Sequence, residues 1–221
     1  MKISGGDVTE TVLHQLKNHW PQINEAAVAA AVPEALARIE DNYRGMPAGR
    51  LWDGEEVLFS PYVSVQWMNF LYRLSRVLYL AGEQESADQV YYLNKILHGI
   101  DWLYAIELPV HFHCEHPLGS VLGRASYGDH LFVYQGTTVG GNRSHGKLSY
   151  PVLGDNVLLC ANATVLGDTK IGDNVIVSAQ AYLINETIPD NCMVFGQSPG
   201  IVIRKKTAQE IREYTTHTWG W

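Results

Sequence analysis

A six-residue repeat runs through the C-terminal half of this chain. Mostly aliphatic residues recur at every sixth position, with one interruption, and small or β-branched residues follow most of them four places later. The recurring positions are Val121, Tyr127, Val133, Val139, Leu153, Leu159, Val165, Ile171, Val177 and Leu183. Neither an α-helix nor a flat sheet has a period of six, whereas a coil that turns a corner every six residues does. The repeat therefore predicts a parallel β-helix in which residues 18 apart, such as Leu153 and Ile171, stack on one another.

The overall composition restricts the partners of the chain. Its 221 residues are 46% hydrophobic and 18% charged, with a formal net charge of -7. The basic run from Arg204 to Lys206 is too short to indicate a nucleic-acid partner. No apolar stretch reaches the length of a membrane span, and the polar N-terminus lacks the apolar core of a signal peptide. Three cysteines without paired spacing are typical of reduced thiols, so we expect a cytoplasmic protein without membrane partners.

The first hundred residues follow a helical period instead. Apolar residues from Trp67 to Ala81 lie along one helical face that ends at Gly82, and a second such face ends at Gly99. The alanine-rich segment 26–39 is also predicted to be helical, with a break or a helix start at Pro33. We therefore expect an α+β chain with an α-helical domain over residues 1–98 and a β-helix over residues 99–203. Residues 204–221 would form a tail or a short helix.

The repeat is interrupted between Val139 and Leu153, which lie 14 apart rather than 6 or 12. The intervening segment 142–151 is polar and should bulge out of the coil as a loop. A loop on a regular scaffold often carries function. The alternative is a tolerated surface insertion.

Titratable residues are concentrated just before the first clear repeats. The segment contains His111, His113, Cys114, Glu115 and His116. A histidine suits a general base that deprotonates a hydroxyl near neutral pH, whereas the H-x4-H spacing of its outer two histidines suits zinc or iron. The alternative is that these are half-buried polar residues at the junction of the helices and the coil. Two further histidines also stay candidates: His130, and His145 on the predicted loop.

Residues 99–204 resemble the serine acetyltransferases, a family of hexapeptide-repeat acyltransferases. The segment of that family from G-V/I-D to D/E-H-x-x-G matches residues 99–119 without a gap. Its motif Q-x-x-T-L/V-G-G is present at residues 135–141, and a ten-residue loop ending in proline follows in both. Residues 196–202 are similar to the family's G-x-P-A-R/K-I/V-I/V, with one extra residue. The resemblance implies an α-helical domain followed by a left-handed parallel β-helix.

The resemblance also implies roles for individual residues. His116 would be the general base that takes a proton from an acceptor hydroxyl as its oxygen attacks the thioester of acetyl-CoA, and Asp101 would orient the imidazole. Glu115 stands where the family has an aspartate that helps to bind the acceptor. Acetyl-CoA would be the co-substrate, and no metal is expected. The implied contacts of the CoA arm and its phosphates are Gly140, Gly141, Ala161, Ala179, Arg204 and Lys205.

The chain departs from the family at the end of the loop. The family has D-R-H-P there, whose arginine and histidine contact the serine carboxylate and the reacting centre, whereas this chain has Leu148-Ser149-Tyr150-Pro151. Loss of the arginine removes a strong charge-assisted contact to a carboxylate, so recognition of L-serine is predicted to be altered. Tyr150 could donate a hydrogen bond to the tetrahedral intermediate. A replacement positive charge could come from Arg143, His145 or Lys147.

Several functions therefore stay open. The first is transfer of acetyl to the hydroxyl of L-serine or a related small acceptor. The second is transfer to a hydroxyl or amine of a sugar or amino sugar for surface polysaccharide. A third is a metal-dependent lyase similar to the γ-class carbonic anhydrases, although residues 70–85 lack the further histidine that this family needs. A non-catalytic scaffold would leave the match at Asp101 and His116 unexplained. By analogy with the family, we expect a homotrimer or a dimer of trimers.

Overall fold

The computed structural model describes residues 1–44, 46–144 and 146–221. The chain divides into two compact units, Met1–Ala105 and Ile106–Trp221. The division falls a few residues after the boundary expected at residue 98, because strand β3 (Asp101–Trp102) and the turn after it belong to the first unit. In the described part of the chain, no helix combines the length and the apolar character that a membrane span requires.

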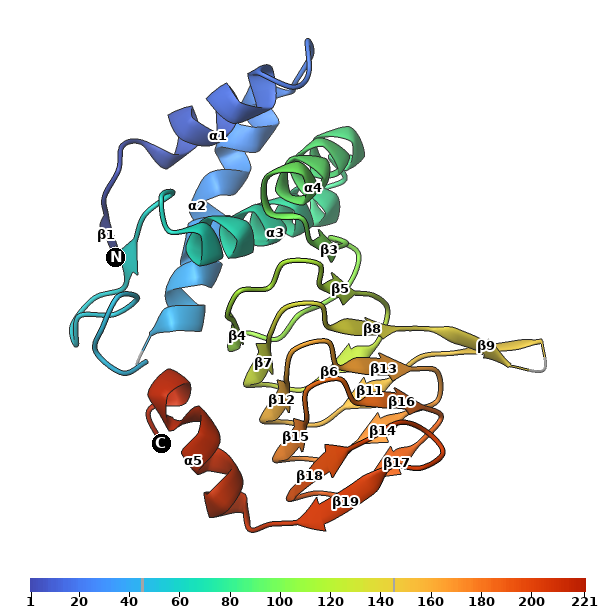
Figure 1. Cartoon of the computed structure of the whole chain (residues 1–221). Helices are drawn as coiled ribbons and strands as arrows, with labels where there is room; N and C mark the ends of the chain where they lie inside the picture. Colours follow the sequence, from blue (N-terminus) through green and yellow to red (C-terminus); the bar gives the residue numbers. More distant parts are fainter. Residues whose placement is uncertain (45, 145) are drawn as a thin grey trace. The chain divides into compact units, whose positions relative to one another are not determined.

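The first unit consists mainly of four helices (Figure 1). They are α1 (Val8–Lys17), α2 (Glu25–Tyr43), α3 (Ser64–Leu80) and α4 (Gln84–His98), and the short strands β1 (Lys2–Ile3) and β2 (Leu58–Phe59) pair in parallel. Helix α3 is buried nearly all round because α2 and α4 both pack against it. Helix α4 ends at Gly99, whose left-handed φ of 62° is a conformation that glycine adopts without steric cost. The break or helix start expected at Pro33 is wrong, since α2 continues through this residue.

The second unit is a coil of short parallel strands in three sheets (Figure 1). The chain visits the sheets in turn, so each sheet gains one strand per coil. One sheet contains β6 (Ser126–Tyr127), β11 (Val152–Leu153), β14 (Lys170–Ile171) and β17 (Thr187–Ile188). The second contains β4 (Phe112–Cys114), β7 (Leu131–Val133), β12 (Val157–Leu159), β15 (Val175–Val177) and β18 (Cys192–Phe195). The third contains β5 (Val121–Leu122), β8 (Thr138–Gly140), β13 (Thr164–Leu166) and β16 (Tyr182–Ile184).

The register of the strands confirms the predicted stacking, with one correction. Leu153 pairs with Ile171, and the aliphatic residues of the other two sheets stack in the same way. The assignment of Val121 as an inward position is wrong, because its side chain is 38% exposed while that of Leu122 is fully buried and pairs with Val139. The turn after Leu122 is one residue shorter than a regular hexad, so the inward position moves by one. The sequence could not distinguish two adjacent aliphatic residues.

Aspartates at one corner of the coil link successive turns. Asp155, Asp173 and Asp190 each accept a hydrogen bond through Oδ1 from the backbone N–H of the aspartate one coil earlier, over 2.7–2.9 Å. The residue after each aspartate has a left-handed backbone, and it is asparagine in these three coils. Asparagine is among the residues that adopt this conformation most readily. We call this column of Asp-Asn pairs the aspartate corner.

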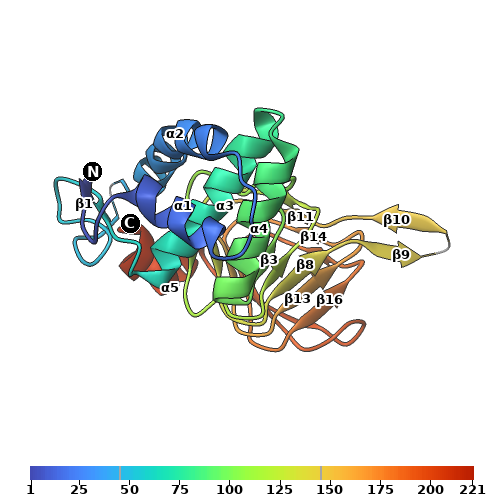
Figure 2. The ribbon, with the colours of Figure 1, turned by 90° about the horizontal axis from the view of Figure 1, so that it is seen from above.

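Two further elements decorate the coil. The predicted loop forms an antiparallel hairpin of β9 (Asn142–Ser144) and β10 (Lys147–Ser149), which projects from the coil in Figure 2. After β19 (Val202–Lys205), which pairs antiparallel with β18, the helix α5 (Ala208–Trp219) begins at a capping box of Thr207 and Glu210. The short helix expected near the C-terminus is thereby confirmed.

Helix α5 covers the outer face of the β4–β7–β12 sheet. Phe132, Leu158 and Ile176 point outward at the middle of their strands, yet all three are buried. The ring of His217 on α5 lies 6.1 Å from that of Phe132, and Trp219 is buried over the same sheet. Strands β7, β12 and β15 are apolar at every position, as is typical of strands buried on both faces, whereas β4 has the buried His113 at its middle position.

Candidate active site

His116 is displayed on an irregular corner of the first coil. Backbone hydrogen bonds align Glu115 with Tyr134 and Gly119 with Gly136 of the next coil. The first coil therefore advances four residues, from Glu115 to Gly119, where the next coil advances two, from Tyr134 to Gly136. The additional residues of the first coil form a bulge at His116. Its side chain is exposed and its backbone is left-handed, with φ of 50°. A non-glycine residue in this conformation is uncommon and often marks a functional position.

Glu115 directly precedes the exposed histidine in the sequence. Its negative charge acts on the nearby Tyr134 hydroxyl, and one of its oxygens is 4.0 Å from Nε2 of His113. Burial and the neighbouring charge of Glu115 raise the pKa of Tyr134 to about 12, so this hydroxyl stays a hydrogen-bond donor. Burial lowers the pKa of His113 to about 4, so its imidazole is neutral near neutral pH. The single negative charge of this group belongs to Glu115.

Asp101 belongs to the first unit, at the start of β3. Its Oδ1 accepts a hydrogen bond of 2.5 Å from the Tyr91 hydroxyl, and its Oδ2 is 2.7 Å from Nζ of Lys95. Partial burial raises the pKa of Asp101, but the contacts with Lys95 and Tyr91 outweigh it and hold the pKa below the usual value. The carboxylate is therefore ionised and held in one orientation. Each oxygen keeps a second lone pair for a further donor.

The hairpin brings two of the predicted acceptor-binding residues next to the glycines of the Q-x-x-T-V-G-G motif. Ser149 pairs with Asn142 across the hairpin. Tyr150 lies directly against Gly141, where an added Cβ would be 2.7 Å from the aromatic ring. Arg143 donates from Nη1 to the carbonyl of Gly146 over 3.2 Å, so its guanidinium is engaged within the hairpin itself. His145 lies outside the described residues.

The residues predicted to bind CoA fall into three groups. Gly140 has open space above its Cα, with nothing within 4 Å of an added Cβ, whereas the space above Gly141 is filled by Tyr150. Ala161 and Ala179 lie 18 apart at one corner, where the carbonyl of Ala161 accepts from the N–H of the residue after Ala179. Arg204 and Lys205 lie on β19 and are exposed, with Arg204 over the ring of Phe195. The structure thus places Gly141 in contact with Tyr150, whereas Arg204 and Lys205 lie on the separate strand β19.

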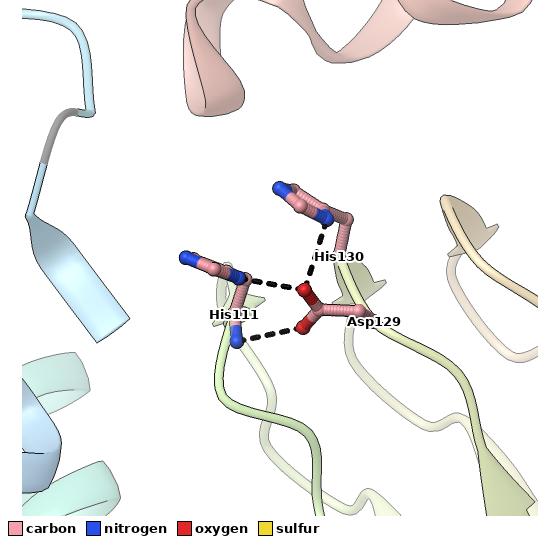
Figure 3. A group of neighbouring side chains, drawn as sticks. All are labelled: His111, Asp129 and His130. Atoms are coloured by element: carbon pink, nitrogen blue, oxygen red, sulfur yellow. Dashed lines mark hydrogen bonds and ion pairs between the residues drawn. The ribbon is translucent and has the colours of Figure 1, made fainter. Parts of the chain in front are cut away.

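A second group of titratable residues was identified only in part from the sequence. The metal-ligand candidate His111 and the further candidate His130 both lie beside Asp129 (Figure 3). Sequence reasoning missed Asp129. The signal that could have found it is the sequence Gly-Asp-His at residues 128–130, which replaces the Gly-Asp-Asn seen at residues 154–156 and 172–174. Among the described residues, the group with metal-ligand geometry contains His111 but not His116.

Known proteins share the repeat of the coil and much of the rest of the sequence. Residues 150–185 match the family described as bacterial transferase hexapeptide (six repeats). Among known proteins, the chain is similar to serine acetyltransferases, which confirms the resemblance seen in the sequence. It is 33% identical over 150 residues to the serine acetyltransferase of Mycobacterium tuberculosis, covering 67% of this chain and 63% of the relative. It is 33% identical over 126 residues to that of Synechocystis sp., covering 57% of this chain and 49% of the relative.

Solved structures show the same fold. The serine acetyltransferase of Neisseria gonorrhoeae superposes with a TM-score of 0.69 at 20% identity, over 95% of this chain and 84% of the other. A serine acetyltransferase in complex with CoA superposes with a TM-score of 0.65 at 17% identity, over 81% of this chain and 75% of the other. The match extends over the helical unit as well as the coil, since it covers nearly the whole chain.

Proposed function

We propose that this protein is an acetyl-CoA-dependent O-acetyltransferase that acts on a small hydroxyl compound, with His116 as the general base. The observation that carries the proposal is the bulged corner, which exposes the imidazole of His116 directly after the carboxylate residue Glu115. A neutral imidazole can accept the proton of an acceptor hydroxyl while the oxygen attacks the thioester carbon. The proton then passes to the departing thiolate of CoA. The similarity to serine acetyltransferases over residues that include this corner supports the same chemistry.

Asp101 is proposed to orient the imidazole and to stabilise the imidazolium that forms during the reaction. Its ionised state, maintained by Lys95 and Tyr91, suits that role. The role depends on the match of Gly99-Ile100-Asp101 with the family motif. It is tested by Asp101→Asn, which keeps the shape of the side chain and removes the charge.

Glu115 is proposed to bind the acceptor together with the hairpin. Ser149 and Tyr150 replace the arginine and histidine of the family, and Arg143 is engaged with the turn of its own hairpin. The described part of the hairpin therefore offers two hydroxyl groups and the exposed ammonium of Lys147 at this end of the coil, in place of the arginine of the family, which weakens bidentate recognition of a carboxylate. A sugar or amino sugar is for this reason the second candidate acceptor, and L-serine is the first on grounds of similarity.

The CoA arm is proposed to run past Gly140, whose open surface lets a chain approach the backbone, and along Ala161 and Ala179. Gly141 then contributes through its backbone beside Tyr150, and Arg204 with Lys205 would meet phosphates. We further propose that the coil is left-handed and that the protein assembles as a homotrimer or a dimer of trimers in the cytoplasm. Sedimentation equilibrium of the purified chain tests the assembly.

The deciding experiment measures thiol release from acetyl-CoA with L-serine, homoserine and a panel of sugars and amino sugars. His116→Ala should lower turnover by about 10²–10⁴, as is typical for a lost general base, while binding of CoA persists. His19→Ala, which removes an exposed imidazole from the first unit, is the matched control and should keep full turnover. Near-normal turnover of the His116 variant would refute the mechanism.

The acceptor is tested with a second variant. Ser149→Arg combined with Tyr150→His restores the two residues of the family motif. If the hairpin sets the acceptor, the double variant should gain activity with L-serine relative to the sugars. An unchanged ratio of kcat/KM values would assign acceptor choice to another part of the site.

A further inference from the structure

Asp129 is held rigidly by the aspartate corner. Its Oδ1 accepts a hydrogen bond of 2.9 Å from the backbone N–H of His111, one coil earlier, and its own N–H donates to Asp155 over 2.7 Å. Asp129 thus extends the column of aspartates by one coil, and its carboxylate links that column to His111 in the first coil. Because Oδ1 serves the backbone, the orientation of Oδ2 is also fixed.

Two imidazoles converge on that oxygen (Figure 3). Nδ1 of His111 is 2.7 Å from Oδ2 of Asp129, and Nδ1 of His130 is 3.3 Å from the same atom. The two rings are stacked with centroids 4.5 Å apart and planes inclined by 14°. One potential ligand atom from each residue lies within 4.8 Å of the other two. Three donors from two successive coils therefore surround one point.

The position of His130 departs from the repeat. In the next three coils the residue after the corner aspartate is Asn156, Asn174 or Asn191, and the Nδ2 of Asn156 donates to Oδ1 of Asn174 over 3.0 Å. His130 has the same left-handed backbone, with φ of 56°, but its side chain is an imidazole instead of an amide that can hydrogen-bond to the asparagine of the next coil. The aspartate corner therefore does not itself require histidine. The exchange occurs in the coil that stacks directly on His111.

The ring of His130 is also held by packing. It meets Trp219 edge to face at 5.1 Å and Trp221 at 4.7 Å. Trp219 is the last residue of α5 and Trp221 lies two residues beyond it, so the C-terminal end of the chain covers this corner. The three side chains nevertheless stay about a third exposed, so a small ion and water could reach them.

We propose that His111, Asp129 and His130 bind one divalent transition-metal ion through Nδ1, Oδ2 and Nδ1, with Zn²⁺ as the ion that best suits this donor set. Two ligands each about 2.0–2.1 Å from a tetrahedral zinc ion lie about 3.4 Å apart, a spacing that His130 and Asp129 already have. The shorter contact of His111 opens by about 0.7 Å when the ion replaces the bridging proton. The fourth position faces solvent, and the backbone bond to Oδ1 is the supporting contact that orients the carboxylate.

The test is Zn²⁺ binding by the full chain after removal of metals with a chelator. Equilibrium dialysis against zinc should give one ion per chain. His130→Asn should weaken binding at least about tenfold, since even residues that only orient ligands change affinity by about 10–100-fold. Asparagine occupies the same corner in three other coils, so this variant should fold. His19→Asn removes an exposed imidazole from the first unit and should leave binding unchanged.

A second variant and a second readout keep the result decisive. His111→Gln leaves the backbone bond to Asp129 in place and should also weaken binding. Zinc should raise the thermal midpoint of the wild-type protein and of His19→Asn but of neither ligand variant. Absence of stoichiometric binding, or equal affinity in His130→Asn, would overturn the proposal. A thiolate charge-transfer band with Co²⁺ would also overturn it, because that band would place the metal on a cysteine. None of these measurements depends on acetyl transfer, so their outcome is separate from the test of the proposed function.

Discussion

Leu122 and Val121 offer a direct test of the register of the first coil. The two residues are adjacent and aliphatic, but the side chain of Leu122 is fully buried and pairs with Val139, while that of Val121 is 38% exposed. Truncating each to alanine should therefore have very different effects. The hexad pattern read from the sequence alone predicts the opposite order.

The magnitudes follow from burial. Leu122→Ala removes three buried carbon groups, worth about 0.8 kcal/mol each on transfer, or about 2.4 kcal/mol in total. The cavity that remains raises the cost to about 2.7–5 kcal/mol. Val121→Ala removes carbons that are partly in water already and should cost less than about 1 kcal/mol.

The assay is urea unfolding of both variants and the wild type, followed by far-UV circular dichroism. Leu122→Ala should lower the midpoint clearly with an unchanged slope, and Val121→Ala should lower it only slightly. A larger loss for Val121→Ala would refute the register described here and restore the regular hexad at the first coil.

Two further predictions concern Gly128, which lies next to the aspartate corner, and the buried His113. Gly128→Ala should lower the thermal midpoint strongly, since its Cβ would lie 2.3 Å from the carbonyl of Gly154, whereas Gly140→Ala meets nothing within 4 Å and should leave stability nearly unchanged. His113, whose pKa burial lowers to about 4, takes up its proton on unfolding, so the free energy of unfolding should rise between about pH 4 and 6.5 by up to about 1.4 kcal/mol per pH unit. His113→Leu should flatten that slope in urea titrations at several pH values, leaving the part due to His98, and an unchanged slope would contradict the assignment.

The proposed catalytic group and the proposed metal site use histidines for different reasons. His116 is exposed on a bulge that interrupts the coil, where an imidazole is free to meet an acceptor. His111 and His130 instead point their Nδ1 atoms at a carboxylate that the repeat itself holds in place. The same short segment of sequence therefore supplies residues to two distinct arrangements.

The sequence by itself determined the coil and most of its register. Period-six spacing can be satisfied only by a chain that turns at regular corners, so the stacking of Leu153 on Ile171 follows from residue spacing alone. Helices α3 and α4 likewise follow from apolar periodicity and from Gly82 and Gly99, and α5 begins at the Thr207 cap, whereas the sequence did not indicate α1 and α2 continues through Pro33. Periodicity and caps are local properties, and a linear sequence records them directly.

Only the tertiary structure decided which adjacent residue points inward and which distant side chains meet. The choice of Leu122 over Val121 depends on the length of one turn. The convergence of His111 and His130 on Oδ2 of Asp129 depends on how the side chains are oriented at the corner, which the 18-residue spacing of stacked coils does not fix. The contact of Tyr150 with Gly141 depends on how the hairpin returns to the coil. Such contacts arise from closing the chain in space, and no local pattern of residue types encodes them.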